Sequence, residues 1–508
     1  MRTVSEVVLR LIFHILTLCS NAPKQLPIVP HTPTLPMTTT SSQPSPSLFQ
    51  LPTSLRVITL NCWGLKYISK HRHARLTQIG HELARASPPP DIVGLQECWT
   101  QEDYLAIRER TEHILPHGKF YWSGVFGGGL AILSRWPLEE TQMVRYALNG
   151  RPSAFWRGDW YVGKGVACAR IRIGSGEGQV VEVFNTHTHA PYERNDDSYL
   201  CHRTAQAWEI ARLMRHAAER GHMVLGMGDF NMVPLSLAHR VIEAHSPVRD
   251  IWRLVKPDSA LGGAWQAEEK ERLRAQGLPV PTASECLREH GATCDSTFNT
   301  WRWSKQMRKD LDKGSDHDPD PKAPDPRARR LDYIFFAGNE GVTGERWEVE
   351  GVEVGMTQRH ETLRCSLSDH FSVEATFTRS RGTSGRLLEK KAMTNLLPLE
   401  AYDSILAMIT KYNIRQRKYR RTKLAEFGLS IAVSIGCFVA IWWSPRNYVS
   451  FILAVLSTLG FAGGVLEGLM GGLFGGSELR ALKEFEYEVR SARMRAESEQ
   501  SKAVGTKD

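Results

Sequence analysis

Residues 222–231 read HMVLGMGDFN, and this stretch decides the fold. Residues 223–227 are a short apolar run of the kind that forms a buried strand. Because residues i and i+2 of an extended chain point to the same side, Asp229 and Asn231 can face one site while Phe230 packs behind them. A carboxylate suits a cation and an amide suits a phosphate oxygen, so this strand end fits phosphoester chemistry. Taken alone, it fits an ordinary strand end with an Asx turn equally well.

Further strands and helices are expected on both sides of this stretch. Apolar or alternating runs that end in polar residues predict strands at 55–61, 91–97, 129–135, 180–186, 330–336 and 371–377. Apolar residues at helical spacing predict helices over 70–86 and 200–220. The irregular alternation of strands and helices indicates a single α/β or α+β domain of roughly 325 residues.

The segments outside and within this domain differ in composition. Residues 1–53 are expected to be a disordered extension, since 21–53 are rich in Pro, Ser and Thr. The apolar stretch at 7–19 is too short to span a bilayer, and whether it is a targeting segment stays open. A charged, proline-rich insert at 304–329 is expected to be a flexible surface loop.

The end of the chain has the pattern of a membrane anchor. Residues 427–444 and 447–466 carry no charge, and each segment is long enough to cross a hydrocarbon core of about 30 Å. The link between them is very short, so the region 424–476 is predicted to be a transmembrane helical hairpin, with a buried hairpin of a soluble protein as the alternative. A linker at 381–423 precedes the hairpin, and a charged tail at 477–508 follows it.

The net charge is +9, and much of the excess lies in the linker, where six of the nine residues at 415–423 are basic. Such a run can bind nucleic acid or anionic lipid, or stop a membrane helix. Its position directly before the apolar segments favours the membrane and anionic phospholipids. Nine cysteines form no zinc or disulfide pattern, which indicates a reducing compartment.

Five other stretches also end predicted strands with polar residues, and together with GDFN they form an ordered set. They are Asn61-Cys62-Trp63, Gln96-Glu97, Thr186-His187, Arg330-Leu331-Asp332-Tyr333 and Ser368-Asp369-His370. This order resembles the endonuclease/exonuclease/phosphatase superfamily, over about 55–378. The domain from 54 to 380 is therefore expected to be the catalytic domain, with the four-layered α/β/β/α sandwich (DNase I-like) of that superfamily.

Within the superfamily, other stretches resemble the neutral sphingomyelinases. They are Gly158-Asp159-Trp160 with Gly163-Lys164, Thr186 to Ala190 followed by Tyr192-Glu193, 202–209, and Thr293 to Ser296 followed by Asn299-Thr300-Trp301. The basic run followed by two apolar segments resembles the fungal inositol phosphosphingolipid phospholipase C branch. The implied activity is hydrolysis of a sphingolipid to ceramide and a phosphorylated head group. Phosphoinositol and phosphocholine head groups both stay open.

Residue chemistry and the resemblance together assign candidate roles. Glu97 is the best single ligand for Mg²⁺, for which Mn²⁺ could substitute, because a hard ion binds carboxylate oxygen. His370 would take a proton from the attacking water, and by resemblance Asp332 pairs with it. His187 either binds the phosphate as a cation or assists the departing oxygen. The remaining candidates are Asn61, Asp369 and Asp229 as metal ligands, Asp229 also as an orienter of water, Asn231 for a phosphate oxygen, and Lys164 for the lipid phosphate.

Other classes of function are less well supported. Residues 158–165 almost match a P-loop but lack the Ser or Thr after the lysine, so no nucleotide is expected. A nuclease or inositol phosphatase shares the core motifs, but the hairpin argues against nucleic acid as substrate. A catalytically inactive membrane scaffold is the alternative from another class.

The charge layout also predicts an orientation in the membrane. Basic residues flank both ends of the hairpin, and the short link carries only Arg446. By the positive-inside rule, both flanks and the catalytic domain face the cytosol. An endoplasmic reticulum or mitochondrial outer membrane location is therefore expected.

Overall fold

The computed structural model describes residues 51–176, 178–192, 197–315, 317–338, 345–381 and 396–505. These residues all belong to one unit, 48–508. The expected disordered extension lies almost wholly outside the described residues, as does most of the linker before 396.

The strands form two six-stranded sheets, in the orders β11-β12-β1-β2-β4-β3 and β5-β6-β7-β8-β10-β9. The first sheet contains β1 (Ser54–Asn61), β2 (Ile92–Gln96), β3 (His117–Tyr121), β4 (Leu130–Ser134), β11 (Glu345–Gly355) and β12 (Ser372–Arg381). The second contains β5 (Leu138–Arg145), β6 (Gly165–Arg172), β7 (Val180–His187), β8 (Met223–Asp229), β9 (Arg249–Asp250) and β10 (Asp332–Ala337). Apolar side chains of both sheets, such as Val57 and Ile92 with Val183 and Leu225, share one buried cluster. The sheets therefore pack face to face.

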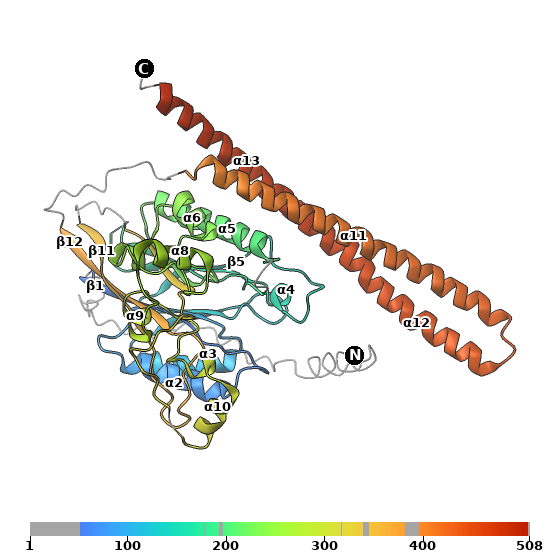
Figure 1. Cartoon of the computed structure of the whole chain (residues 1–508), viewed down its shortest axis with the longest axis horizontal. Helices are drawn as coiled ribbons and strands as arrows, with labels where there is room; N and C mark the ends of the chain where they lie inside the picture. The colour runs from blue at the N-terminus through green and yellow to red at the C-terminus, as the bar shows by residue number, and fades with distance from the viewer. Residues whose placement is uncertain are drawn as a thin grey trace, which may run out of the picture. The chain divides into compact units, whose positions relative to one another are not determined.

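Helices cover the outer face of each sheet (Figure 1). On the first sheet, α2 (Arg72–Arg85) and α3 (Gln101–Thr111) contribute Leu76, Ile79 and Ile107 to a buried cluster. On the second, α5 (Leu200–Glu219) and α6 (Leu237–His245) do the same with residues such as Ile210. The expected α/β/β/α sandwich is confirmed, as are the expected strands and the helices at 70–86 and 200–220. Shorter helices are α4 (Asp159–Val162), α7 (Ile251–Val255), α8 (Ala267–Gln276), α9 (Ala283–Arg288), η2 (Thr300–Arg302) and α10 (Lys305–Asp312).

The central strand β8 gathers the polar strand ends. It runs parallel to β7, with His187 opposite Asp229, and antiparallel to β10, with Asp332 opposite Asp229. The glycine of the GDFN sequence is required here: Gly228 has φ +135°, and a β-carbon would lie 1.9 Å from the carbonyl oxygen of Thr186. The strand register thus brings the side chains of His187, Asp229 and Asp332 to one edge of the sheet.

The insert at 304–329 contains local structure that its composition did not indicate. Helix α10 opens it, capped by the Ser304 side chain, which accepts from the Met307 N–H. Near its end, the buried Asp325 carboxylate accepts from the backbone N–H of Thr297 at 2.7 Å. The insert therefore begins with a capped helix, and its C-terminal part is hydrogen-bonded to the domain.

Three long helices end the chain: α11 (Leu399–Trp442), α12 (Asn447–Leu469) and, after the π-helical turn η3 (Met470–Phe474), α13 (Gly475–Gly505). The basic run at 415–423 lies within α11, in a stretch from 399 to 427 that contains neither Gly nor Pro. Within the described part of the chain, two helices are long and apolar enough to cross a membrane, and only 6 % and 11 % of their most apolar stretches is buried. That exposure is opposite to what a buried soluble hairpin would show.

The ends of this helical region pack on the catalytic domain. Tyr402 and Ile405 of α11 and Leu482 and Phe485 of α13 are buried in the same cluster as Ile210 of α5. The charged tail is therefore an additional layer over the second sheet.

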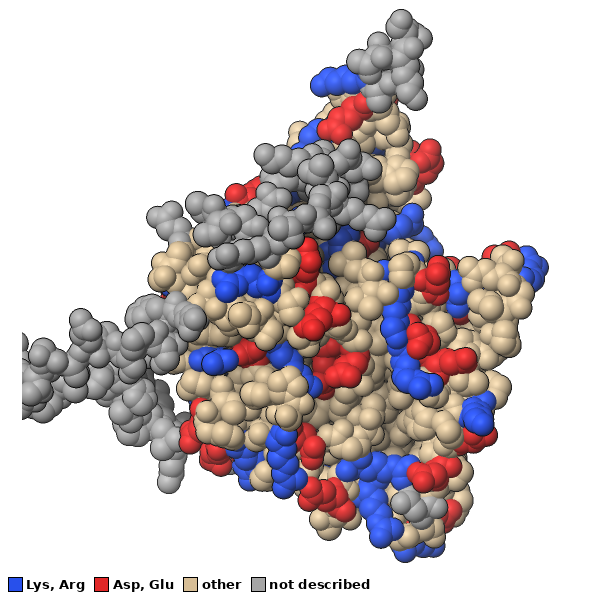
Figure 2. Space-filling view, turned by 90° about the vertical axis from the view of Figure 1, so that its left-hand side faces the viewer, with Lys and Arg blue, Asp and Glu red and all other residues tan. Residues whose placement is uncertain are grey.

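The face of the molecule in Figure 2 carries Lys and Arg interspersed with Asp and Glu. No single sign of charge dominates there.

Candidate active site

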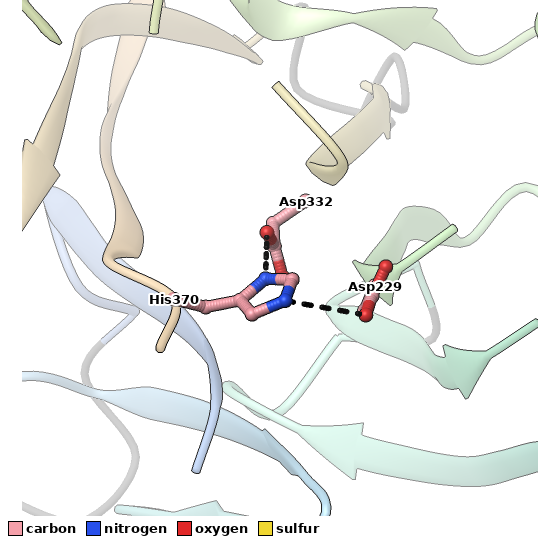
Figure 3. A group of neighbouring side chains, drawn as sticks. All are labelled: Asp229, Asp332 and His370. Carbon is pink, nitrogen blue, oxygen red and sulfur yellow. Dashed lines mark hydrogen bonds and ion pairs between the residues drawn. The ribbon is translucent and has the colours of Figure 1, made fainter. Parts of the chain in front are cut away.

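The centre of the site is a buried group of two aspartates and a histidine (Figure 3). One ligand atom from each of Asp229, Asp332 and His370 lies within 4.8 Å of the others. The Nδ1 of His370 lies 2.8 Å from Oδ2 of Asp332, and its Nε2 lies 4.0 Å from Oδ2 of Asp229. The strand register of β8 and β10 fixes the two aspartates, and His370 stands just before β12.

The pairing with Asp332 defines what His370 can do. Burial lowers the pKa of His370, but the Asp332 carboxylate and Cys294 together outweigh burial and hold that pKa well above its ordinary value. The same Asp332 oxygen accepts a hydrogen bond from the Thr293 hydroxyl at 2.6 Å. With Nδ1 bound to a carboxylate, Nε2 is the nitrogen that faces the site and exchanges protons.

Asn61 connects this group to Glu97. Its Nδ2 donates to Oε1 of Glu97 at 3.2 Å and to Oδ2 of Asp229 at 3.0 Å. Its Oδ1 accepts from the Trp63 N–H at 3.0 Å, so in this structure Asn61 turns its amino group, and not its oxygen, toward the carboxylates. Asn61 and Glu97 lie at the ends of the neighbouring parallel strands β1 and β2.

The donor set fits a hard cation. Among the described residues, Oε2 of Glu97 and Oδ1 of Asp332 are buried without a hydrogen-bond partner. Burial and Asp369 raise the pKa of Glu97 to about 7, and burial and Asp332 raise that of Asp229 to about 6. A divalent cation bound at Glu97 would give its unpartnered oxygen a ligand and relieve the crowding of negative charge.

His187 is neutral in this environment. Its Nε2 lies 3.6 Å from Oδ2 of Asp229, while burial and the charge of Lys164 hold its pKa well below the ordinary value. Lys164 and Asn231 meet at one carbonyl: Nζ of Lys164 donates to the oxygen of Thr188 at 2.9 Å, and Nδ2 of Asn231 donates to the same oxygen at 3.2 Å. All the candidate residues thus lie at one edge of the sandwich.

Several residues of the site were not assigned roles from the sequence. Thr293 donates a hydrogen bond to Asp332, but in the sequence it is recognisable only as part of a motif similar to the neutral sphingomyelinases. Asp159 lies 3.7 Å from Nζ of Lys164 and 3.3 Å from Nδ1 of His189, but its run looked like an incomplete P-loop.

A buried amide pair joins the two sheets below the site. The Gln96 side chain donates to Oδ1 of Asn185 at 2.7 Å. Gln96 directly precedes Glu97, and Asn185 directly precedes the Thr186-His187 pair. This position in the sequence was the only indication that the two amides lie near the site. The contact between the two amides joins different sheets, so it could be recognised only in the three-dimensional structure.

The fold and the geometry define a class of protein: a two-sheet sandwich with a buried carboxylate–histidine group at one edge. The model of the Endonuclease/Exonuclease/phosphatase family matches residues 58–370, and the chain belongs to this family.

Similarity to individual proteins is more specific, and with one of them it extends beyond the catalytic domain. The chain is 37 % identical over 441 residues to the Inositol phosphosphingolipids phospholipase C of Schizosaccharomyces pombe, covering 87 % of this chain and 94 % of that protein. It is 36 % identical to human Sphingomyelin phosphodiesterase 2 over 198 residues, 39 % of this chain and 46 % of that protein. Among solved structures, sphingomyelinase C from Streptomyces griseocarneus matches 64 % of this chain and 99 % of its own, with 18 % identity and a TM-score of 0.39. The chain is a homologue of sphingolipid phospholipases C, and the expected resemblance is confirmed.

Proposed function

We propose that this protein is a membrane-anchored, Mg²⁺-dependent phospholipase C that hydrolyses a sphingolipid phosphodiester to ceramide and a phosphorylated head group. The observation that carries the proposal is the buried Asp229–Asp332–His370 group in a chain with a relative of this activity over 87 % of its length. Inositol phosphosphingolipids and sphingomyelin are both candidate substrates.

The cation held by Glu97, with Asp229 and Asp369 nearby, would neutralise a phosphate oxygen and stabilise the charge that develops on attack. The positive charge of that cation would lower the pKa of His370, so that Nε2 of the neutral ring would accept the proton of the attacking water and Asp332 would stabilise the resulting imidazolium. The water oxygen bonds to phosphorus and the bond from phosphorus to the ceramide oxygen breaks.

The other residues of the site bind and orient the phosphodiester. His187, being neutral, supplies a hydrogen bond to the departing ceramide oxygen, which takes its proton from solvent. Asn231 and Lys164 both donate to the Thr188 carbonyl in this structure. When substrate binds, we expect them to donate to a phosphate oxygen instead.

The membrane part of the proposal rests on the exposed apolar helices α11 and α12. Both flanks of the hairpin are basic, which favours a cytosol-facing catalytic domain in the endoplasmic reticulum or the mitochondrial outer membrane. The exposed basic residues of α11 would contact anionic phospholipids.

Product analysis tests the activity. The purified full-length protein is incubated with inositol-phosphoceramide, sphingomyelin or lyso-phosphatidylcholine in ¹⁸O-labelled water with Mg²⁺. Ceramide and a head-group phosphate carrying ¹⁸O are expected from at least one sphingolipid. Label in a free, unphosphorylated head group, or release of ceramide phosphate, would show that the other side of the phosphodiester is cleaved.

A further inference from the structure

Two neighbouring loops beside the site expose an unusual amount of aromatic surface. Trp122, Val125 and Phe126 follow β3 and are 65 %, 71 % and 50 % exposed, and Phe155 and Trp156 precede α4 and are 51 % and 71 % exposed. We call these four aromatic side chains, together with Val125, the aromatic rim. Large exposed aromatic groups are uncommon unless another surface covers them.

The two loops form one structure because Tyr161 joins them. The Tyr161 carbonyl accepts from the Val125 N–H at 2.6 Å, and its hydroxyl donates to the carbonyl of Pro152 at 2.9 Å. The rings of Tyr161 and Phe126 are 5.9 Å apart, and those of Phe155 and Trp156 are 5.1 Å apart. The aromatic rim is therefore exposed on an organised surface.

Cationic side chains hold the second loop to the domain. Arg151 lies 4.3 Å above the ring of Tyr199 and donates to the Ser198 hydroxyl at 2.8 Å. Arg157 lies 4.6 Å above the ring of Tyr192. The loop thus has a charged, anchored base and an apolar tip.

The same loop, and helix α4 that follows it, contact the helical region that carries the apolar segments. The ring of Trp160 packs 5.0 Å from Phe474 in η3, and Arg151 lies 5.9 Å from the ring of Tyr412 in α11. Figure 1 shows α4 on the side of the domain next to these helices.

The position of Phe474 relates the loop to the depth of the membrane. The pair between Lys423 and Glu467, 2.9 Å apart, marks the charged end of the apolar segments. Phe474 comes seven residues after Glu467, about 10 Å along a helix. The loop therefore lies at the level of lipid head groups when the hairpin spans a bilayer.

The aromatic rim also borders the site. Its second loop continues through α4 to Lys164, whose Nζ reaches the carbonyl of Thr188 next to His187. The Ser123 hydroxyl of the first loop donates to the carbonyl of Gly163 at 2.6 Å. A surface that holds these loops at head-group level brings the site to the phosphodiester of a lipid.

We propose that the aromatic rim docks on the lipid bilayer, so that the catalytic domain lies on the membrane in a fixed orientation with the site at the head groups. Tryptophan and other aromatic rings favour this interface because one part stays apolar and another stays hydrated. The proposal builds on the proposed function, since it places that same site on its substrate surface.

A comparison of two substrate forms tests the docking. The full-length protein is reconstituted in phosphatidylcholine vesicles containing the sphingolipid, and turnover is compared with that on the same lipid dispersed in detergent. For the double variant Phe155→Ser, Trp156→Ser, the ratio of vesicle to detergent turnover is expected to fall by about tenfold or more. The matched control is Leu254→Ser, Trp265→Ser, which removes an exposed aliphatic and an exposed aromatic side chain outside the rim and should leave the ratio unchanged. A ratio within about twofold of wild type in the rim variant would overturn the proposal.

Fluorescence gives a test that does not depend on activity. In vesicles of brominated phosphatidylcholine, the bromine quenches tryptophans that enter the interface. Trp156→Phe is expected to lose part of the quenched signal, and Trp265→Phe to lose only unquenched signal. Equal behaviour of the two variants would overturn docking. If Trp156 becomes less quenched as the number of protein chains per vesicle rises, a second copy of the protein covers the aromatic rim. That result would also overturn docking on lipid. If the wild type cleaves no sphingolipid while Trp156 is quenched, the proposed function fails and the docking stands.

Discussion

Glu97 has two features that are uncommon for a carboxylate in a strand end. Its φ is +52°, a left-handed conformation that non-glycine residues rarely adopt, and one of its oxygens is buried without a partner among the described residues. The backbone is held in this conformation while Asn61 binds the other oxygen at 3.2 Å. Strain of this kind points to a role in which the side chain must face the site.

Glu97→Gln is therefore expected to lower turnover by about 100-fold or more at ordinary Mg²⁺, since it removes the main charged oxygen donor while keeping the shape. Turnover is measured against Mg²⁺ concentration on a detergent-dispersed sphingolipid. The control Glu109→Gln changes a carboxylate that is 74 % exposed and should behave as wild type. Normal turnover of Glu97→Gln at low Mg²⁺ would show that Glu97 is not a ligand of the metal.

A second residue-scale prediction concerns stability and pH. Asp250 is buried and bound to Arg330 at 2.7 and 2.8 Å and to His239 at 3.2 Å. Burial raises the pKa of Asp250, but Arg330 and His239 outweigh it and hold that pKa well below its ordinary value. The stabilising effect is therefore complete above the unfolded-state pKa of about 4, and it is lost as the pH falls toward the lower folded-state pKa.

Asp250→Asn is expected to lower the free energy of unfolding at pH 7 by about 3–5 kcal/mol, because Arg330 stays buried without its charge partner. Thermal unfolding in detergent, followed from pH 7 to pH 3, should show a lower melting temperature at pH 7 and a difference from wild type that shrinks as the pH falls. The exposed Asp258→Asn is the control. A difference that is independent of pH would contradict this origin.

At the scale of elements, Glu478 joins three helices. Its Oε1 accepts from the Tyr412 hydroxyl of α11 at 2.6 Å and lies 3.1 Å from Nε2 of His202 in α5, and its Oε2 accepts from Gln416 at 2.6 Å. One carboxylate of α13 thus fixes the helical region to the catalytic domain.

Glu478→Ala should destabilise the protein by about 2–4 kcal/mol, because three buried partners lose their acceptor. The melting temperature in detergent and the rate of proteolytic cleavage within α13 measure the effect. Glu484→Ala removes an exposed carboxylate from the same helix and serves as the control. An unchanged melting temperature with faster cleavage of α13 would show that the helix docks without stabilising the domain.

The strands, and the polar groups that end them, could be recognised in the sequence for a common physical reason. Asn61, Glu97 and His187 each end or directly follow an apolar run, and parallel neighbours bring such ends to one edge. Thr293 was not predictable as a support of Asp332, because it lies in a loop whose path depends on the finished sandwich.

The helical region shows a different limit. The run from 399 to 427 lacks Gly and Pro and could have been recognised as a helix. The apolar positions of α13 are visible at helical spacing, but nothing in them indicates that α5 is their partner. Local signals predict elements, and contacts between distant elements require the three-dimensional structure.

At the scale of the whole molecule, the two apolar segments and their flanks predict an orientation in the membrane. Exposed basic residues precede the first segment, and Lys483 and Arg490 follow the second, while the link carries Arg446. By the positive-inside rule the catalytic domain is expected on the cytosolic side. Protease added to sealed, right-side-out microsomes should digest it. Its full protection, with digestion after the membrane is opened by detergent, would reverse the orientation.

The same basic residues predict a response to membrane charge. Arg415, Arg417, Lys418, Arg420 and Arg421 are all exposed on α11, next to the charged end of the apolar segments. Near an anionic leaflet, each Lys or Arg contributes about 1 kcal/mol of attraction within a Debye length. The run is therefore expected to draw α11, and the domain packed on it, toward an anionic surface, so that turnover in vesicles rises with the fraction of anionic phospholipid.

Replacing these five residues with Gln should remove most of that rise and leave turnover of detergent-dispersed substrate unchanged, because no bilayer surface is then involved. The matched control carries five Gln substitutions at Lys305, Lys309, Lys313, Lys322 and Arg327, which are exposed on the catalytic domain. The control changes net charge equally, so it should keep the response if position, and not total charge, is what matters. Raising the salt concentration should weaken the wild-type response and have little effect on the α11 variant. A full response in the α11 variant, or its equal loss in the control, would contradict a specific role for α11.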